Sequence, residues 1–148
     1  WPRRSACSPP MSSDHSPPFF PATRAMDAAY RATSYVVLGC GAMRIGHRAD
    51  RLARRGATFV TAHNPLGHPM TRAFNIRCAR RLQAALRRRG WRFIHAEGRP
   101  DDPSVPPEPG LLVFGTSRGE AAALGRMVRQ NAVVHVRRGK RAELVALR

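Results

Sequence analysis

Between residues 57 and 136, short apolar runs alternate with two segments of helical periodicity, and this order constrains the fold most. The apolar runs are typical of buried strands and cover residues 57–62, 91–97, 110–115 and 132–136. One helical segment lies between the first and second runs, and another between the third and fourth. The predicted order is therefore strand, helix, strand, strand, helix, strand.

Both helices carry recognisable start signals. Thr71 is a good N-cap for a long helix that ends before Gly90, and apolar residues recur inside it at helical spacing, which predicts a face in the core. Ser117 followed by Glu120 forms a capping box for a second helix that ends near Arg129. Further elements are expected outside this unit: helices at 27–31 and 49–55, a strand at 35–38, and a final strand at 143–147 in a hairpin with 132–136.

This order of elements predicts an α+β fold. Strand, helix, strand, strand, helix, strand is the split pattern of a ferredoxin-like two-layer sandwich. We therefore expect a mostly antiparallel sheet with the two main helices on one face. The Gly39-Cys40-Gly41 sequence is interpreted as a turn, because no third glycine follows at the spacing of a dinucleotide-binding fingerprint.

The 148 residues fit one domain preceded by a leader. Residues 1–25 are rich in Pro, Ser and Arg and lack apolar periodicity, which predicts disorder. Residues 26–148 are predicted to form a single α+β domain that begins near Met26. The three cysteines are widely spaced and include no CxxC pair, which argues against a disulfide framework. With no apolar run long enough for a membrane span or a secretory signal, a cytoplasmic location without membrane contact is expected.

Five polar residues are expected to gather at one edge of the predicted sheet. The first strand ends just before Asn64, and the following helix starts there and passes Asn75. The next strand returns to the same edge at Glu97, Glu108 precedes a strand that starts there, and Gln130 follows the second helix back to it. The predicted topology therefore defines a candidate site.

The same positions carry a resemblance to a protein family. The matching strings are, in order, residues 59–65 (Phe-Val-Thr-Ala-His-Asn-Pro), Asn75, Glu97-Gly98-Arg99, Pro107-Glu108-Pro109, and Gln130-Asn131-Ala132-Val133. Over about residues 30–147 the chain resembles DUF3293, an uncharacterised bacterial family. The family pattern often has an acidic residue where this chain has Phe74 and a serine where it has Gly110. The resemblance implies a place for the site and no established activity.

Carboxylates and amides in this cluster suggest binding or catalysis. Glu97 and Glu108 could hold Mg²⁺ or act as an acid and base pair, and His63 is the candidate general base. The expected ligand-binding residues for a small molecule or anion are Asn64, Asn75, Arg99 and Gln130. The alternative is structural: amides at strand ends often satisfy turn backbone, and the glutamates could simply pair with arginines. The sequence leaves open whether the site is catalytic.

The charge of the chain favours a second function. A net charge of +17 would attract nucleic acid at low salt, and the long predicted helix is rich in arginine. The candidate nucleic-acid-binding residues are Arg77, Arg80, Arg81, Arg87 and Arg88. The alternative is a solvated basic face, because an excess of Arg over Lys also arises from a GC-rich genome and aromatic residues are not interleaved with the arginines.

Overall fold

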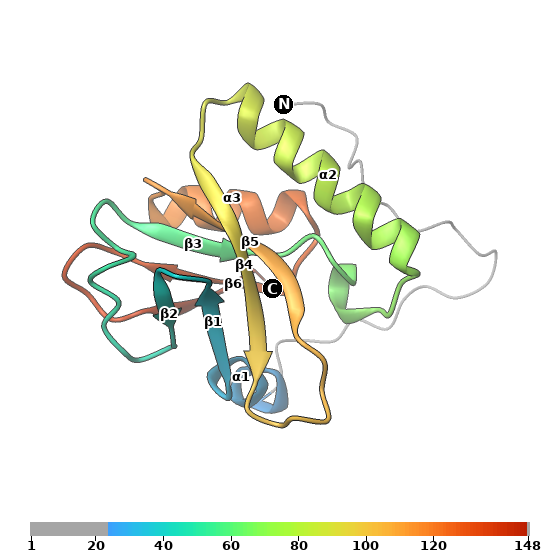
Figure 1. Cartoon of the computed structure of the whole chain (residues 1–148), viewed down its shortest axis with the longest axis horizontal. Helices are drawn as coiled ribbons and strands as arrows, with labels where there is room; N and C mark the ends of the chain where they lie inside the picture. Colours follow the sequence, from blue (N-terminus) through green and yellow to red (C-terminus); the bar gives the residue numbers. More distant parts are fainter. Residues whose placement is uncertain (1–23, 148) are drawn as a thin grey trace.

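The computed structural model describes residues 24–147, in which helices and strands follow each other in mixed order (Figure 1). The helices are α1 (Arg24–Arg31), the 3-10 helix η1 (Pro65–Gly67), α2 (Arg72–Arg88) and α3 (Arg118–Met127). The strands are β1 (Thr33–Val37), β2 (Gly41–Met43), β3 (Ala57–Val60), β4 (Phe93–Pro100), β5 (Glu108–Phe114), β6 (Ala132–Val136) and β7 (Glu143–Ala146). Residues 1–23 of the predicted leader lie outside the described residues, and its last two residues begin α1.

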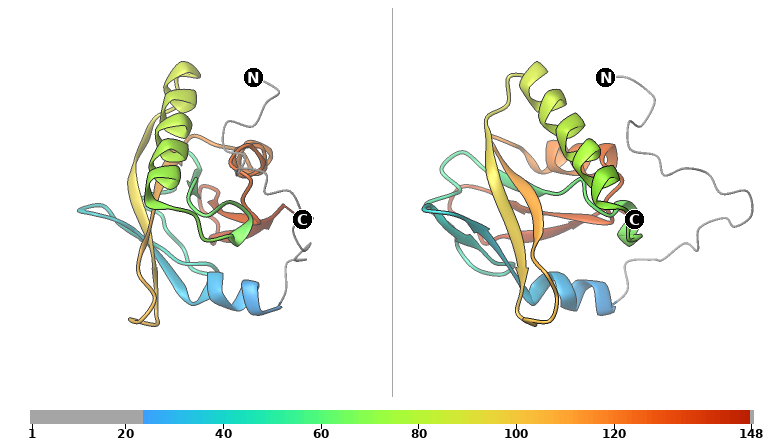
Figure 2. Two further views of the ribbon diagram at one scale, coloured as in Figure 1. Left: turned by 90° about the vertical axis from the view of Figure 1, so that its right-hand side faces the viewer. Right: turned by 45° about the vertical axis from the view of Figure 1, so that its right-hand side comes forward.

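All seven strands join one antiparallel sheet in the order β2-β1-β4-β5-β3-β6-β7. The sheet is strongly curled. Ile45, just after β2 at one edge, bridges to Ala142, just before β7 at the other edge, and Arg48 bridges to Arg141. These bridges draw the two edges toward each other, so the sheet forms a half-barrel (Figure 2).

Two apolar cores lie against this sheet. In the first, the apolar faces of α2 and α3 pack on Val60, Leu111 and Val113, in keeping with the predicted helical stripe. The second core contains Phe59, Leu112 and other residues of the opposite strand faces. Successive side chains of a strand point to opposite faces, so neighbours such as Phe59 and Val60 belong to different cores.

The α+β class is confirmed, and the six elements predicted between residues 57 and 136 occur in the predicted order. The ferredoxin-like two-layer sandwich is not confirmed. The sheet has seven strands instead of four, it curls into a half-barrel, and its second face carries a core of its own. The added strands β1, β2 and β7 cause this difference, because they extend the sheet at both ends.

Local signals were mostly interpreted correctly. The Thr71 side chain accepts a hydrogen bond from the Phe74 N–H, and Ser117 and Glu120 form the capping box. The β6–β7 hairpin and the turn at Gly39 are also present.

The helix predicted at 49–55 is wrong, because this segment is a series of turns. In this segment the backbone N–H groups of Leu52 and Ala53 donate to the carbonyl oxygen of Ala49. These hydrogen bonds span a single turn, which is too short to be stable as a helix by itself. Leu52 and Ala53 are instead buried in the second core. The sequence also missed β2, whose three residues are too few to show an alternating pattern.

Candidate functional site

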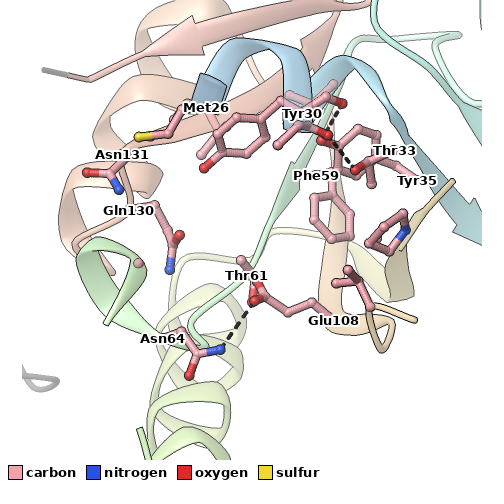
Figure 3. A pocket seen from close by; sticks show the side chains of 18 of the residues that line it. Met26, Tyr30, Thr33, Tyr35, Phe59, Thr61, Asn64, Glu108, Gln130 and Asn131 are labelled. Atoms are coloured by element: carbon pink, nitrogen blue, oxygen red, sulfur yellow. Dashed lines mark hydrogen bonds between the residues drawn. The ribbon is translucent and has the colours of Figure 1, made fainter. Parts of the chain in front are cut away.

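A cavity of about 510 Å³ lies on the sheet face of the second core, closed by α1, by η1 and by the loop between β4 and β5. Met26 and Tyr30 of α1 line one side of the cavity, and Phe59 and Glu108 of the sheet line another. Figure 3 shows Tyr30, Phe59, Thr61 and Gln130 around the central space. Segments far apart in the sequence therefore line one site.

Asn64 lies at the rim of this cavity in an unusual conformation. Its backbone is left-handed (φ 46°, ψ 59°), which asparagine tolerates better than other non-glycine residues. The buried Asn75 side chain holds it there: Asn75 Oδ1 accepts from Asn64 N at 2.9 Å, and Asn75 Nδ2 donates to Asn64 Oδ1 at 3.0 Å. Asn64 Oδ1 also accepts from Met70 N at 3.0 Å. Asn75 does not line the cavity and acts through Asn64.

Gln130 enters the cavity from the end of α3. Its Nε2 donates to the carbonyl oxygen of His63 at 2.7 Å, and its own backbone N–H donates to Gly125 O at 2.9 Å. The first bond leaves the Gln130 side-chain oxygen as an acceptor. It also ties the loop after β3 to the loop before β6, and Leu66 N strengthens this link by donating to Arg129 O at 2.8 Å.

Among the described residues that line the cavity, Glu108 is the only Asp, Glu, Lys, Arg or His. Asn64 Nδ2 lies 3.5 Å from its Oε2, at the long limit of a hydrogen bond (Figure 3). Burial raises the pKa of Glu108, while the nearby Thr61 and Asn64 side chains act in the opposite direction. Burial, followed by the charge of Glu108, raises the pKa of Tyr30 to about 12, so the phenol keeps its proton.

Glu97 and Arg99 do not join this cluster. Glu97 pairs with Pro109 across the β4–β5 ladder, whereas Glu108 pairs with Gly98. Directly paired residues share a face and neighbours along a strand alternate, so Glu97 and Glu108 lie on opposite faces of the sheet. Arg99 follows Glu97 by two positions and forms a salt bridge with it on that outer face. The expected convergence of Glu97 with the other four polar residues is therefore wrong.

His63 lies beside the cavity and is not among its lining residues. Its backbone N–H donates to Thr61 Oγ1 at 3.0 Å, and its carbonyl accepts from Gln130. Burial of the half-buried imidazole lowers the pKa of His63. Both bonds use backbone atoms of His63, so they hold the loop in position. Within the described residues, the His63 ring forms no hydrogen bond with Glu108.

Sequence reasoning missed the aromatic wall of the cavity. Tyr30 and Tyr35, both tyrosines of the chain, line it together with Phe59. The Tyr35 and Phe59 ring centroids are 4.8 Å apart and the rings are tilted by 50°. A usable signal was present in Gly98 and Gly110, because glycine inside a strand often marks the close approach of another group.

Those two glycines make room for the rings. A Cβ atom at Gly110 would lie 2.5 Å from Phe59 Cζ, and one at Gly98 would lie 3.6 Å from Tyr35 Cε1. Gly110 is two residues from Glu108 on the same strand face, and Gly98 pairs with Glu108 across the β4–β5 ladder. The Phe59 ring therefore covers the backbone at Gly110 and the Tyr35 ring covers the backbone at Gly98, the two glycines next to Glu108 on this face of the sheet.

The described residues include no preformed site for a metal ion or for nucleic acid. Between residues 24 and 147, no group of three or more His, Cys, Asp or Glu side chains is placed to hold a metal ion. The five candidate arginines of α2 are exposed, and none of them forms a salt bridge within the described part of the chain. Arg77 stacks over Phe74 at 5.9 Å and Arg87 over Phe93 at 5.5 Å.

The described helices include none with the length and apolar character needed to cross a membrane. Comparison with curated proteins and with solved structures found no match. The model of one family, described as a protein of unknown function (DUF3293), matches residues 60–133, which is half of the chain. The matched region runs from the end of β3 to β6 and includes Asn64, Asn75, Glu108 and Gln130. The chain therefore belongs to the DUF3293 family.

Proposed function

We propose that this domain binds a small organic molecule in the cavity between α1 and the curled sheet. The observation that carries the proposal is the cavity itself: its volume of about 510 Å³ falls in the range of small-molecule sites. Its walls are mostly apolar and aromatic, and a few polar groups converge on it. This combination of an apolar lining and sparse polar contacts is typical of ligand pockets.

The polar groups would fix the orientation of the ligand. Glu108 and the Gln130 side-chain oxygen supply acceptors, and the Tyr30 hydroxyl can donate or accept. The Asn64–Asn75 pair supports this end of the cavity, because it holds the loop that carries Asn64 in one conformation. A site held by such bonds loses less entropy when a ligand binds.

The proposal is limited to binding. The acid and base pair and the Mg²⁺ site predicted from Glu97 and Glu108 would need the two carboxylates side by side, and they lie on opposite faces of the sheet. Arg99 is on the outer face with Glu97, so it does not contribute an anion-binding group to the cavity.

A cavity-filling variant tests the proposal. A Cβ at Gly98 would make only ordinary contacts with Thr33 and Tyr35, so Gly98→Val is expected to fold while placing its methyl groups over the cavity floor. His95→Val is the matched control, because His95 is exposed on the same strand. Each protein is incubated with a small-molecule extract of bacterial cells, separated by gel filtration and denatured, and the released compounds are identified by mass spectrometry.

We expect the wild-type protein and His95→Val to retain the same compound and Gly98→Val to lose it. Thermal unfolding of all three proteins establishes that they are folded. Retention of an equal amount by Gly98→Val, or retention of nothing by the wild type, contradicts the proposal.

Nucleic-acid binding is a second candidate, favoured by the exposed arginines of α2 that have no carboxylate partner in the described residues. It is tested by fluorescence anisotropy with labelled oligonucleotides over a range of salt concentrations. The four substitutions Arg80→Gln, Arg81→Gln, Arg87→Gln and Arg88→Gln would reduce the slope of log K against log salt by about 0.9 per lost phosphate contact on duplex DNA. The control removes the same charge from another exposed surface, at Arg51, Arg54, Arg55 and Arg138. Equal slopes for the two variants would contradict a specific role for α2.

A further inference from the structure

The cavity differs in composition from the basic protein around it, because its one acidic or basic side chain among the described residues is a glutamate. The chain has 26 Lys and Arg residues and a net charge of +17, yet between residues 24 and 147 no Lys, Arg or His lines the cavity. Glu108 is the acidic residue among the described lining residues, and no arginine forms a salt bridge with it in the described part of the chain. Fields of distant surface arginines are screened over about 8 Å at physiological salt, so the local groups decide which charge the cavity accepts.

The groups around Glu108 extend this preference. Tyr30, Tyr35 and Phe59 present aromatic rings, whose faces are negative and attract cations. Phe59 lies against Gly110 and Tyr35 against Gly98, which are the neighbours of Glu108 along and across the sheet. The oxygen of Gln130 and the Tyr30 hydroxyl add acceptors on the far side (Figure 3).

An anionic ligand would find unfavourable contacts in this cavity. It would lie near a carboxylate and near aromatic faces, without a cationic partner, in a partly water-excluded space. A wholly apolar ligand would cover the carboxyl of Glu108 and add no partner to its long hydrogen bond from Asn64 Nδ2, which is also unfavourable. A cationic group with N–H or N–CH₃ surface satisfies both the carboxylate and the rings.

From this arrangement we infer that the cavity binds a small organic amine, with its ammonium group between Glu108 and the aromatic wall of Tyr30, Tyr35 and Phe59. This inference rests on the proposed small-molecule function and specifies the chemical class of the ligand. The apolar body of the amine would occupy the remaining volume toward Met26 and Val134.

Three probes of matched size and different charge test the inference by isothermal titration calorimetry on the full chain: phenethylamine, 2-phenylethanol and phenylacetate. We expect the protonated amine to bind at least about tenfold more tightly than the alcohol, and the carboxylate most weakly, as cation–π and ion-pair contacts predict. Glu108→Gln should remove most of the preference for the amine over the alcohol while leaving alcohol affinity within about twofold. Tyr30→Leu should reduce the same preference without any change of charge.

Glu97→Gln is the matched control, because it removes a carboxylate from the same sheet region on the opposite face. It should leave the affinities of all three probes unchanged. Equal binding of amine and alcohol by the wild type, or an undiminished amine preference in Glu108→Gln, would overturn the ammonium site while leaving small-molecule binding in place. If none of the probes binds, the amine class is overturned, and the retained compound in the extract experiment decides separately whether the cavity binds another class.

Discussion

Asn64 and Asn75 show how two side chains can set the shape of one end of the cavity. Asn64 adopts left-handed backbone angles that cost energy for most residues, and the reciprocal amide bonds with Asn75 offset this cost. These bonds cross from the loop after β3 to the first turn of α2. Their loss would release the loop that carries Asn64.

Asn75→Ala is therefore expected to lower the free energy of unfolding by about 1–3 kcal/mol, because it leaves the Asn64 backbone N–H without its acceptor and removes one of the two donors to Asn64 Oδ1. Urea denaturation followed by circular dichroism measures the change. Gln83→Ala on the same helix is the control and should alter stability by less than about 0.5 kcal/mol. An unaltered midpoint in Asn75→Ala would show that the pair does not support the loop.

Gly110 and Gly119 provide a second comparison between single residues. An added Cβ at Gly110 would meet Phe59 Cζ at 2.5 Å and the Val60 carbonyl oxygen at 2.9 Å, so Gly110→Ala should destabilise the protein by about 1–3 kcal/mol through overpacking. A Cβ added at Gly119 in α3 would lie 4.0 Å from Ser117 Oγ and meet no closer side chain, so Gly119→Ala should stabilise by about 0.5–1 kcal/mol. Thermal unfolding of both variants checks the opposite signs, and a stabilising Gly110→Ala would contradict the described position of the Phe59 ring.

At the scale of elements, α2 and α3 begin where short polar motifs satisfy their first amide groups. The Ser117 side chain accepts from Glu120 N at 3.2 Å, and Glu120 Oε2 accepts from Ser117 N at 2.7 Å. The helix thus starts at a defined residue, and its inner face, including Ala121 and Leu124, meets the sheet. A defined start of α3 also fixes where this helix ends, and Gln130, which follows that end, lines the cavity.

Ser117→Ala should cost about 1 kcal/mol of stability, because an N-cap hydroxyl is lost. Ser104→Ala is a suitable comparison, since the Ser104 hydroxyl donates to Asp102 Oδ1 in an exposed loop, and its effect should remain below about 0.5 kcal/mol. Equal midpoints of chemical denaturation for the two variants would argue against a stabilising capping box.

The whole molecule is organised by the curl of one sheet between two cores. His135 is fully buried in β6, with Nδ1 at 3.0 Å from Thr58 Oγ1 and Nε2 without a hydrogen-bond partner in the described residues. Burial is the main cause that lowers the pKa of His135. A protonated imidazole would place a charge in the core, so burial favours the neutral ring in the folded state.

This preference for the neutral ring predicts a pH dependence of global stability. Below about pH 6.5, the ordinary pKa of histidine, the unfolded chain binds a proton that the folded His135 does not, so the free energy of unfolding falls as pH falls. The lowered pKa of His63 acts in the same direction and the raised pKa of Glu108 in the opposite one. His135→Leu should therefore lose less stability than the wild type between pH 7 and pH 5, two values chosen to bracket this pKa. Urea titrations at both pH values measure this, with exposed His95→Gln as control, and parallel losses in wild type and His135→Leu would contradict it.

The sequence by itself determined the elements whose signals are local. The Thr71 cap, the Ser117 capping box and the apolar stripe of α2 depend on residues three or four positions apart, so they could be recognised without the fold. The proximity of Asn64, Asn75, Glu108 and Gln130 was also predictable, because it follows from where strands and helices begin and end.

The tertiary structure alone decided which of these residues face the cavity. Glu97 and Glu108 are both glutamates near ends of neighbouring strands, and only the pairing of Glu97 with Pro109 places them on opposite faces. A shift of one residue in this register would reverse the result, because side chains alternate along a strand. The aromatic wall likewise depends on curling, which brings α1 with Tyr30 to Phe59 and Glu108, and such long-range contacts leave no periodic signal in the chain.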